Sequence, residues 1–273
     1  MSTDVGMSSC CISGQLHNHA TPSGTVQTIG DLSTYVAEPS SKDHSKTLIF
    51  LVDIFGYEFP NTRLLADEYA KAGFYVLVPD ILQGDPLPIS FLQNVEPPLK
   101  DQEQAGLIDK AKNTAVVGAT LGTWLPKHRE AVTLPIVEKF VDDVKKTTTG
   151  KIGTIGFCFG GRYSIIMAHG KVDAAYACHP SLVAIPGDFD PVTKPLSLAV
   201  GTKDSLLSDD QNNQIKEILE KKSDVPTKLV KYEDQIHGFA LRGDWSSDKD
   251  KKAQDDALQQ GIDWFNQYLN TLV

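Results

Sequence analysis

Short apolar segments alternate with longer amphipathic segments along most of the chain. Six apolar runs, bounded by turn-forming or charged residues, predict β-strands. Several of them are hydrophobic at nearly every position, which is typical of parallel strands covered on both faces. The predicted strands cover residues 47–52, 74–78, 151–155, 174–177, 196–200 and 227–232.

The intervals between these runs carry the periodicity of helices. Apolar residues recur every three or four positions within residues 136–144 and 258–269. A shorter stripe of Leu65, Tyr69 and Ala72 is followed by Gly73, which is placed to end that helix. Such alternation predicts a single α/β domain over all 273 residues. Its core would be a doubly wound, mostly parallel sheet with right-handed crossovers.

Two segments depart from this alternation. Residues 1–25 are small and polar and indicate an irregular N-terminal arm. From about residue 85 to 129 no clear strand appears, and prolines 86, 88, 97 and 98 interrupt the first part. So long an excursion inside a compact domain is typical of a functional lid. We expect a partly helical cap over the carboxyl edge of the sheet, where ligand sites of α/β proteins lie.

The strongest chemical motif is GFCFGG at residues 156–161, between a predicted strand and a helical run. It has the form of the nucleophile elbow G-x-S-x-G, with Cys158 in place of serine. Gly156 and Gly160 supply the small residues that so tight a turn needs, and the helix N-terminus favours a thiolate at Cys158. The backbone N–H of Phe159 would point toward a developing oxyanion. The alternative is a glycine turn with a buried cysteine, since the glycine spacing does not match a dinucleotide-binding loop.

An elbow of this kind needs an acid and then a histidine later in the chain. Asp204 follows the strand predicted at 196–200, and His237 follows the strand predicted at 227–232 after a short loop. Both therefore belong at the edge where Cys158 lies. His237 would hold Cys158 as a thiolate, and Asp204 would orient the imidazole. Alone, Asp204 could equally be a loop cap and His237 a surface histidine.

The chain resembles the dienelactone hydrolases (carboxymethylenebutenolidases), members of the α/β-hydrolase superfamily, from about Leu48 to the C-terminus. The resemblance rests on VDIFGYEFPNTR, FYVLVPD, GFCFGG, the Asp204 loop and IHGFALR. It implies hydrolysis of enol-lactones by a triad of Cys158, Asp204 and His237. It also implies that Asp53 modulates the nucleophile, at a place where bacterial members carry the longer glutamate.

The turn DIFG at residues 53–56 is also expected to form part of the oxyanion hole. A second N–H donor should come from the turn after the first predicted strand, and Ile54 is best placed to supply it. The alternative for Asp53 is a purely local role as the cap of this turn.

Arginine is scarce and lies close to the motifs. Only four of the 26 basic residues are arginine, and Arg63, Arg162 and Arg242 follow the Asp53 turn, Cys158 and His237, respectively. A guanidinium grips a carboxylate through two parallel hydrogen bonds, which lysine cannot do. We therefore expect a small-molecule substrate that bears a carboxylate. The alternative is that these arginines form structural ion pairs.

Composition narrows the class further. A formal charge of −9 argues against a nucleic-acid partner, and no stretch approaches the roughly 18 apolar residues of a membrane span. Four cysteines are too few for a disulfide scaffold, and no targeting segment is evident, so we expect a cytoplasmic protein with reduced thiols. Cys10 and Cys11 with His17 and His19 match no common zinc spacing, and neither metal nor cofactor is expected. The sequence leaves a monomer and a homodimer open.

A cysteine nucleophile limits the substrates. A thiolate leaves more readily than an alkoxide, because a thiol has a pKa of about 8.5 and water-like oxygens about 15.7. Enol-lactones, aryl esters and thioesters are therefore favoured over fats and amides. One alternative is a C–C or decarboxylative hydrolase that acts on a polyketide-like acid with the same triad. Another is a non-catalytic ligand-binding or redox-sensing protein, against which the complete triad speaks.

Overall fold

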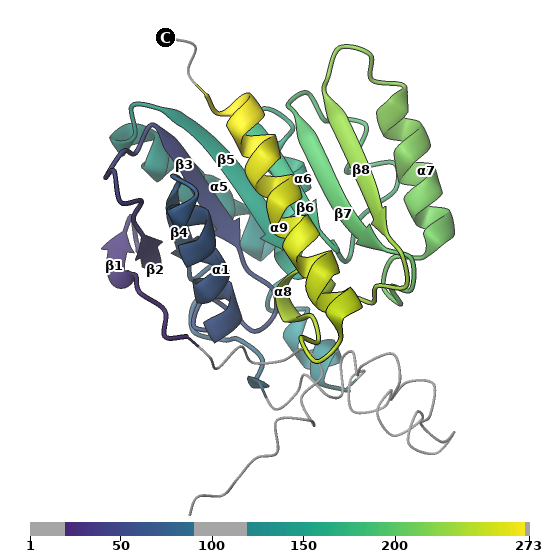
Figure 1. Cartoon of the computed structure of the whole chain (residues 1–273), viewed down its shortest axis with the longest axis horizontal. Coiled ribbons are helices and arrows are strands. Elements are labelled where there is room, and N and C mark those ends of the chain that lie inside the picture. Colours follow the sequence, from purple (N-terminus) through teal and green to yellow (C-terminus); the bar gives the residue numbers. More distant parts are fainter. Residues whose placement is uncertain (1–19, 90–118, 271–273) are drawn as a thin grey trace, which may run out of the picture.

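The computed structural model describes residues 20–89 and 119–270, and within them the predicted α/β fold is confirmed. Its centre is one eight-stranded sheet in the order β1-β2-β4-β3-β5-β6-β7-β8 (Figure 1). The strands are β1 (Thr25–Ile29), β2 (Leu32–Ala37), β3 (Lys46–Leu51), β4 (Tyr75–Pro79), β5 (Lys151–Phe157), β6 (Ala174–Cys178), β7 (Leu196–Gly201) and β8 (Thr227–Tyr232).

All six predicted strands are present, with boundaries shifted by no more than two residues. The prediction missed β1 and β2, which form an antiparallel hairpin that joins β4 in antiparallel orientation. Four of the five side chains of β1 are exposed, so this edge strand lacks the apolar signal of the interior strands. The sheet is therefore mixed at this edge and parallel from β4 through β8.

The parallel register brings the carboxyl ends of the strands to one edge of the sheet. Leu51 of β3 pairs with Gly156 of β5, Phe157 of β5 pairs with Cys178 of β6, and Gly201 of β7 pairs with Tyr232 of β8. The residues that follow these strands therefore meet along one line. This edge is where an open α/β sheet places its ligand site.

Helices cover both faces of the sheet. α1, α8 and α9 lie on one face and α5 and α6 on the other, whereas α7 packs on the edge strand β8 (Figure 1). The helical periodicities noted above fall in α5, α9 and α1, so those helices are confirmed. The helices are α1 (Pro60–Lys71), α5 (Glu130–Thr147), α6 (Phe159–Met167), α7 (Asp209–Glu220), α8 (Phe239–Arg242) and α9 (Asp248–Tyr268).

Aromatic side chains fill the layer between the sheet and the α1–α9 face. Phe50 of β3 contacts Tyr69 of α1 edge to face, at 5.4 Å between ring centroids. Phe265 of α9 reaches Phe74 at 6.2 Å and Tyr176 of β6 at 6.5 Å. These five rings are all fully or almost fully buried. They fix α1 and α9 to the sheet strands that carry the candidate site at their ends.

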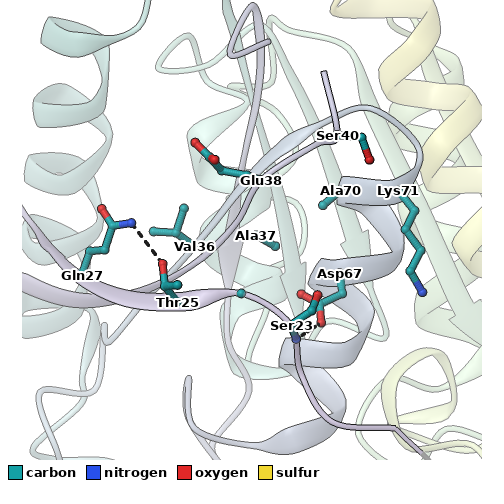
Figure 2. A pocket seen from close by; sticks show the side chains of 11 residues that line it. Ser23, Thr25, Gln27, Val36, Ala37, Glu38, Ser40, Asp67, Ala70 and Lys71 are labelled. Atoms are coloured by element: carbon teal, nitrogen blue, oxygen red, sulfur yellow. Dashed lines mark hydrogen bonds between the residues drawn. The ribbon is translucent and has the colours of Figure 1, made fainter. Parts of the chain in front are cut away.

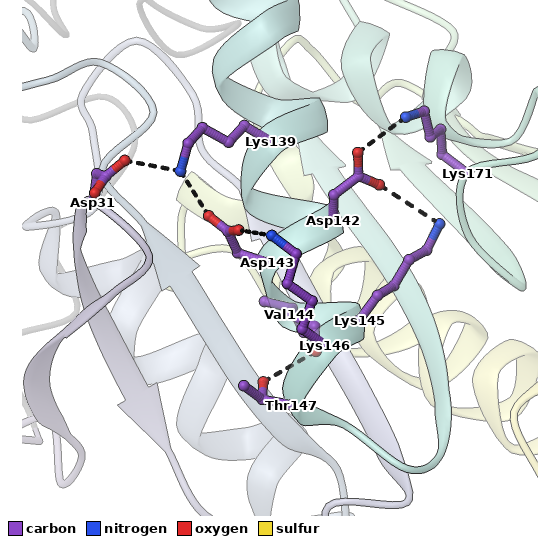
Figure 3. Close-up of polar contacts among 9 residues, drawn as sticks. All are labelled: Asp31, Lys139, Asp142, Asp143, Val144, Lys145, Lys146, Thr147 and Lys171. Atoms are coloured by element: carbon purple, nitrogen blue, oxygen red, sulfur yellow. Dashed lines mark hydrogen bonds and ion pairs between the residues drawn. The ribbon is translucent and has the colours of Figure 1, made fainter.

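On the opposite face, lysines of α5 form a surface network of ion pairs (Figure 3). Lys139 lies 2.8 Å from both Asp31, in the turn between β1 and β2, and Asp143. Exposed pairs of this kind contribute little individually, so the network orients α5 more than it stabilises the fold. Within the described residues, no helix has the length and apolarity needed to cross a membrane.

Candidate active site

Cys158 occupies the turn between β5 and α6, as the glycine pattern predicts. Its backbone has φ 52° and ψ −114°. Non-glycine residues rarely adopt such a conformation, and it is found most often at functional sites. A Cβ on Gly156 would lie 2.2 Å from the carbonyl oxygen of Gly160, and one on Gly160 would lie 2.0 Å from that of Leu51. Both contacts are with backbone, so only glycine fits on either side of Cys158.

Asp204 and His237 meet at the same edge. His237 Nδ1 lies 2.9 Å from Asp204 Oδ2, and both side chains are buried. The other carboxylate oxygen of Asp204 accepts hydrogen bonds from the backbone N–H groups of Leu206 and Leu207, at 2.8 and 3.3 Å. Because an ionised carboxylate only accepts, Nδ1 carries the hydrogen and Nε2 faces away from Asp204. The loop after β7 thus fixes the orientation of the imidazole.

The charge balance around His237 favours its protonated form. Burial alone would lower the pKa of His237, but the Asp204 carboxylate and the Cys158 thiolate beside it together hold that pKa well above the ordinary value. The structure therefore brings together all three residues that the elbow pattern predicted.

Asp53 lies at the end of β3 and pairs with Arg242 of α8. One of its oxygens accepts the N–H of Phe55 at 2.9 Å, as a turn cap would, and the other forms a short ion pair with Arg242 Nη1. Both side chains are almost completely buried, and the guanidinium lies over the ring of Phe55 at 5.3 Å. Burial raises the pKa of Asp53 despite the opposing charge of Arg242.

The other two predicted arginines also contact protein groups. Arg162 of α6 makes two hydrogen bonds to Asp188, at 2.7 and 3.2 Å, and a third to the more exposed Glu130 at 2.6 Å. Arg63 donates to the carbonyl oxygen of Tyr57 at 2.9 Å and lies over the ring of Tyr35 at 5.1 Å. Each of the three predicted arginines therefore contacts groups of the protein itself.

Cys158 opens into an apolar cavity of about 220 Å³. Among the described residues that line it, none is charged, and Ser181 and Gln211 supply the polar side chains other than the thiol. Leu182 and Leu206 at this cavity are about half exposed, which is unusual for large aliphatic side chains in this chain. The lining comprises Ile54, Leu121, Leu125, Cys158, Phe159, Ser181, Leu182, Val183, Leu206 and Gln211.

The predicted oxyanion donors, Ile54 and Phe159, both line this cavity beside Cys158. A second cavity of about 230 Å³ adjoins the first, since Leu125, Phe159 and Leu182 line both. The second cavity differs in carrying charge, because Arg162 and Glu130 form part of its wall.

The two described ends of the predicted cap meet at this site. Trp124 Nε1 donates to the carbonyl oxygen of Asp85 at 2.8 Å, and His128 and Lys127 each lie 3.1 Å from the carboxylate of Asp85. Trp124 also packs edge-on against Phe159, at 5.2 Å between centroids. Residues 90–118 of the predicted cap lie outside the described residues, as do Cys10, Cys11, His17 and His19.

The sequence analysis missed the contribution of the segment after β6. Ser181 Oγ lies 3.6 Å from Cys158 Sγ. His179 is fully buried, and its ring meets that of His237 edge to face at 5.1 Å between centroids. Burial, His237 and Arg242 hold the pKa of His179 well below its ordinary value, so the ring is neutral. The sequence feature that could have identified this segment is the position of CHPS (residues 178–181), directly after the strand predicted at 174–177.

A larger cavity, of about 390 Å³, lies between the β1–β2 hairpin and α1 (Figure 2). It is polar and contains none of the predicted site residues. Asp67, the buried acid in its wall, already accepts hydrogen bonds from Ser23 N at 2.7 Å and Tyr35 Oη at 2.6 Å. In the described part of the chain, no cluster of three or more His, Cys, Asp or Glu side chains is arranged to hold a metal ion.

The fold is that of the α/β-hydrolase class, with Cys158 on a strained turn between a strand and a helix of a mostly parallel sheet and an acid and a histidine in the loops after later strands. The model of the dienelactone hydrolase family matches residues 32–269, and the chain belongs to that family of hydrolases.

Named relatives agree with this assignment. The chain is 31% identical to hydrolase pyvD of Aspergillus violaceofuscus, over 98% of this chain and 99% of that one. It is 30% identical to hydrolase tropI of Talaromyces stipitatus, over 96% of each chain. A crystal structure described as a putative dienelactone hydrolase from Klebsiella pneumoniae superposes with a TM-score of 0.67 at 21% identity, over 90% of this chain and 99% of that one.

Proposed function

We propose that this hydrolase uses Cys158 as its nucleophile, with His237 and Asp204, to open enol-lactones or cleave similarly activated esters. The observation that carries the proposal is the position of Cys158 on a strained turn, facing an apolar cavity, next to a buried His237 that Asp204 holds at 2.9 Å. The raised pKa of His237 supports a resting state with thiolate and imidazolium side by side.

In the acylation step, the Cys158 thiolate attacks the carbonyl carbon of the substrate and forms a C–S bond. The carbonyl oxygen takes the negative charge and accepts hydrogen bonds from the backbone N–H groups of Ile54 and Phe159. The C–O bond then breaks, and His237 gives its Nε2 proton to the departing oxygen. A thioester remains on Cys158. In a lactone, the released enol stays attached to the acyl chain.

Deacylation reverses the roles of the same groups. Neutral His237 accepts a proton from water, and the resulting hydroxide attacks the thioester carbonyl. Collapse of the tetrahedral adduct breaks the C–S bond and releases the acid and the thiolate. The proton on His237 restores the starting ion pair, with Asp204 stabilising the imidazolium throughout. One water is consumed for each ester cleaved.

The nucleophile and the cavity both select the substrate. Because a thiolate leaves more readily than an alkoxide, the first adduct returns to substrate unless the departing oxygen is a good leaving group, as an enolate or phenolate is. The cavity of about 220 Å³ favours an apolar acyl group next to the reacting carbon. A thiol nucleophile also requires reduced cysteine, and we propose the cytoplasm as its compartment.

A carboxylate on the substrate remains a prediction, and Arg162 is its best-placed partner. Arg162 lines the adjoining cavity, and its contact with Glu130 is the more exposed of its two ion pairs. A substrate carboxylate that displaced Glu130 would keep the buried Asp188 pair intact. The acid group would then lie beyond Phe159, on the side away from Cys158.

The leaving group provides the test of this function. With the acyl group held constant, the acylation rate should fall steeply from nitrophenyl through phenyl and enol to ethyl esters. Cys158→Ala should lower hydrolysis of the aryl ester on the order of 10³-fold or more, because it removes the nucleophile. Cys158→Ser should flatten the dependence on the alcohol. Stopped-flow acylation rates, measured on the purified full-length chain, provide the comparison.

Cys178→Ala is the matched control, because Cys178 is the other buried cysteine among the described residues and burial raises its pKa to about 12. It should retain aryl esterase activity. Full activity of Cys158→Ala, or ethyl esters cleaved as fast as aryl esters of the same acid, would contradict the proposal.

A further inference from the structure

The segment His179–Leu182, here called the β6 loop, leaves the sheet between the strands that carry Cys158 and Asp204. Backbone hydrogen bonds attach the end of β6 and this loop to both sides of the nucleophile. Cys158 N donates to the carbonyl oxygen of Cys178 at 3.2 Å, and Ser181 N donates to the carbonyl oxygen of Cys158 at 3.0 Å. The loop is therefore fixed to the backbone of the nucleophile itself.

The backbone of the β6 loop is strained where it passes Cys158. His179 has φ 37° and Leu182 has φ 59°, values that side-chain-bearing residues rarely adopt. Such conformations persist where the surroundings impose them, and they concentrate at active sites. Here they enclose Ser181 and hold it against the nucleophile. An ordinary connection between two strands would need neither strained residue.

The side chain of Ser181 contacts the sulfur of Cys158. Its hydroxyl oxygen lies 3.6 Å from Cys158 Sγ, and both residues are at least 95% buried. A serine hydroxyl can donate or accept, whereas a thiolate can only accept. When Cys158 is ionised, the Ser181 hydrogen must therefore point toward the sulfur.

We propose that Ser181 is a further catalytic residue, whose hydroxyl donates a hydrogen bond to the Cys158 thiolate in the resting enzyme. The inference rests on the proposed function, since it assumes that Cys158 is the nucleophile. No proton moves between the two groups. The hydrogen bond increases the fraction of Cys158 that is ionised, and it also makes each thiolate less reactive, because it stabilises the charge that attack must remove from sulfur.

These two consequences act in opposite directions and give the proposal a distinctive signature. A hydrogen bond to a charged group changes an equilibrium by about tenfold or more, so loss of the hydroxyl should lower the thiolate fraction about tenfold at low pH. Thiolate nucleophilicity rises with basicity with a coefficient of about 0.4–0.5, so each remaining thiolate should react about threefold faster. Without the hydroxyl, Cys158 should react about threefold more slowly at low pH and about threefold faster at high pH.

The experiment measures alkylation of Cys158 by iodoacetamide from pH 5 to 10 in the full-length chain, with the modified cysteine identified by peptide mass spectrometry. Ser181→Ala should give a rate curve that crosses the wild-type curve. Ser181→Thr keeps the hydroxyl and should follow the wild type. Ser181→Gly also removes the hydroxyl and adds no group that could clash. If the alanine variant folds poorly, the glycine variant should give the same crossing rate curve.

Three outcomes would overturn the proposal: a Ser181→Ala curve that superimposes on the wild type, a curve lowered equally at every pH, or a threonine variant that behaves like alanine. An equal lowering would mean that Ser181 only shapes the site. Aryl ester hydrolysis by Cys158→Ala separates the two proposals. Retained activity in that variant defeats the proposed function, whereas lost activity with unchanged Ser181→Ala alkylation defeats only this inference.

Discussion

Asp53 and Arg242 are two charged residues withdrawn almost completely from solvent, and each is compensated by the other. Their protonation behaviour differs. A guanidinium does not lose its proton in proteins, whereas burial already raises the pKa of the Asp53 carboxyl. Removal of one partner therefore has different consequences, depending on which one is removed.

Asp53→Asn should destabilise the protein by about 3–5 kcal/mol, since it leaves the charge of Arg242 buried without compensation. Arg242→Met should cost less, because Asp53 can take up a proton and become neutral. Urea unfolding at neutral pH measures both. Glu68→Gln, which breaks the exposed pair with Lys71, serves as control and should change stability by less than about 1 kcal/mol. Equal costs for the two buried variants would contradict this account.

The sequence predicted the positions of Cys158, Asp204 and His237 because each directly follows a strand with a clear apolar signal. The partner of Arg242 could not be predicted in this way. Asp53 and Arg242 are 189 residues apart, and their pairing depends on how α8 lies against the turn after β3. Ser181 was missed for a related reason: the sequence places it just after a strand, but its contact with Cys158 depends on the path of the loop, which includes two residues with positive φ.

At the scale of elements, the turn between β5 and α6 is tightly restricted. Its two flanking glycines face backbone atoms at 2.2 Å or less from an added Cβ, and backbone cannot move aside as a flexible side chain can. The position of the sulfur therefore depends on the packing of α6 against the end of β3.

Gly160→Ala should push α6 away from Leu51 and displace Cys158. A displacement of about 1 Å at a reacting group costs on the order of 10²-fold in rate, so aryl ester hydrolysis should fall at least that far. Gly122→Ala is the matched control, because an added Cβ there meets nothing within 4 Å. Steady-state kinetics and thermal melts of both variants supply the measurement. An active Gly160→Ala variant would show that the turn tolerates a shift of α6.

The prediction identified the six strands of the parallel part of the sheet and missed the antiparallel β1–β2 hairpin at its edge. Interior strands such as β5 and β7 are buried at nearly every position, and their short, mainly apolar runs identify them. The exposed strand β1 is defined by pairing with β2 rather than by its own side chains. Such pairing is a long-range property, and a local apolar pattern does not report it.

For the molecule as a whole, buried histidines couple the stability of the fold to pH. His179 has a folded-state pKa well below 6.5, so below pH 6.5 the unfolded chain binds a proton that the folded chain does not, and stability falls as pH falls. His237 acts in the opposite direction. Its raised pKa gives stability that is complete below pH 6.5 and is lost as pH rises through its folded pKa.

His179→Phe should therefore weaken the loss of stability between pH 6.5 and 5. One proton accounts for a slope of about 1.4 kcal/mol per pH unit at most, and the variant should be shallower by up to that amount. Urea unfolding at intervals of half a pH unit measures the slope. A His179→Phe slope equal to the wild-type slope would show that another group controls acid unfolding.

The residues proposed to carry out the reaction and most of those that line the cavity belong to different parts of the fold, and this has an evolutionary consequence. Ile54, Leu121, Leu182, Leu206 and Gln211 line the cavity, and all of them lie outside the strands of the sheet. Mutations at such positions alter the shape offered to an acyl group without disturbing the register that aligns Cys158 with Asp204 and His237. Descendants of one ancestral gene can therefore diverge in the compounds they accept while they inherit the same reaction.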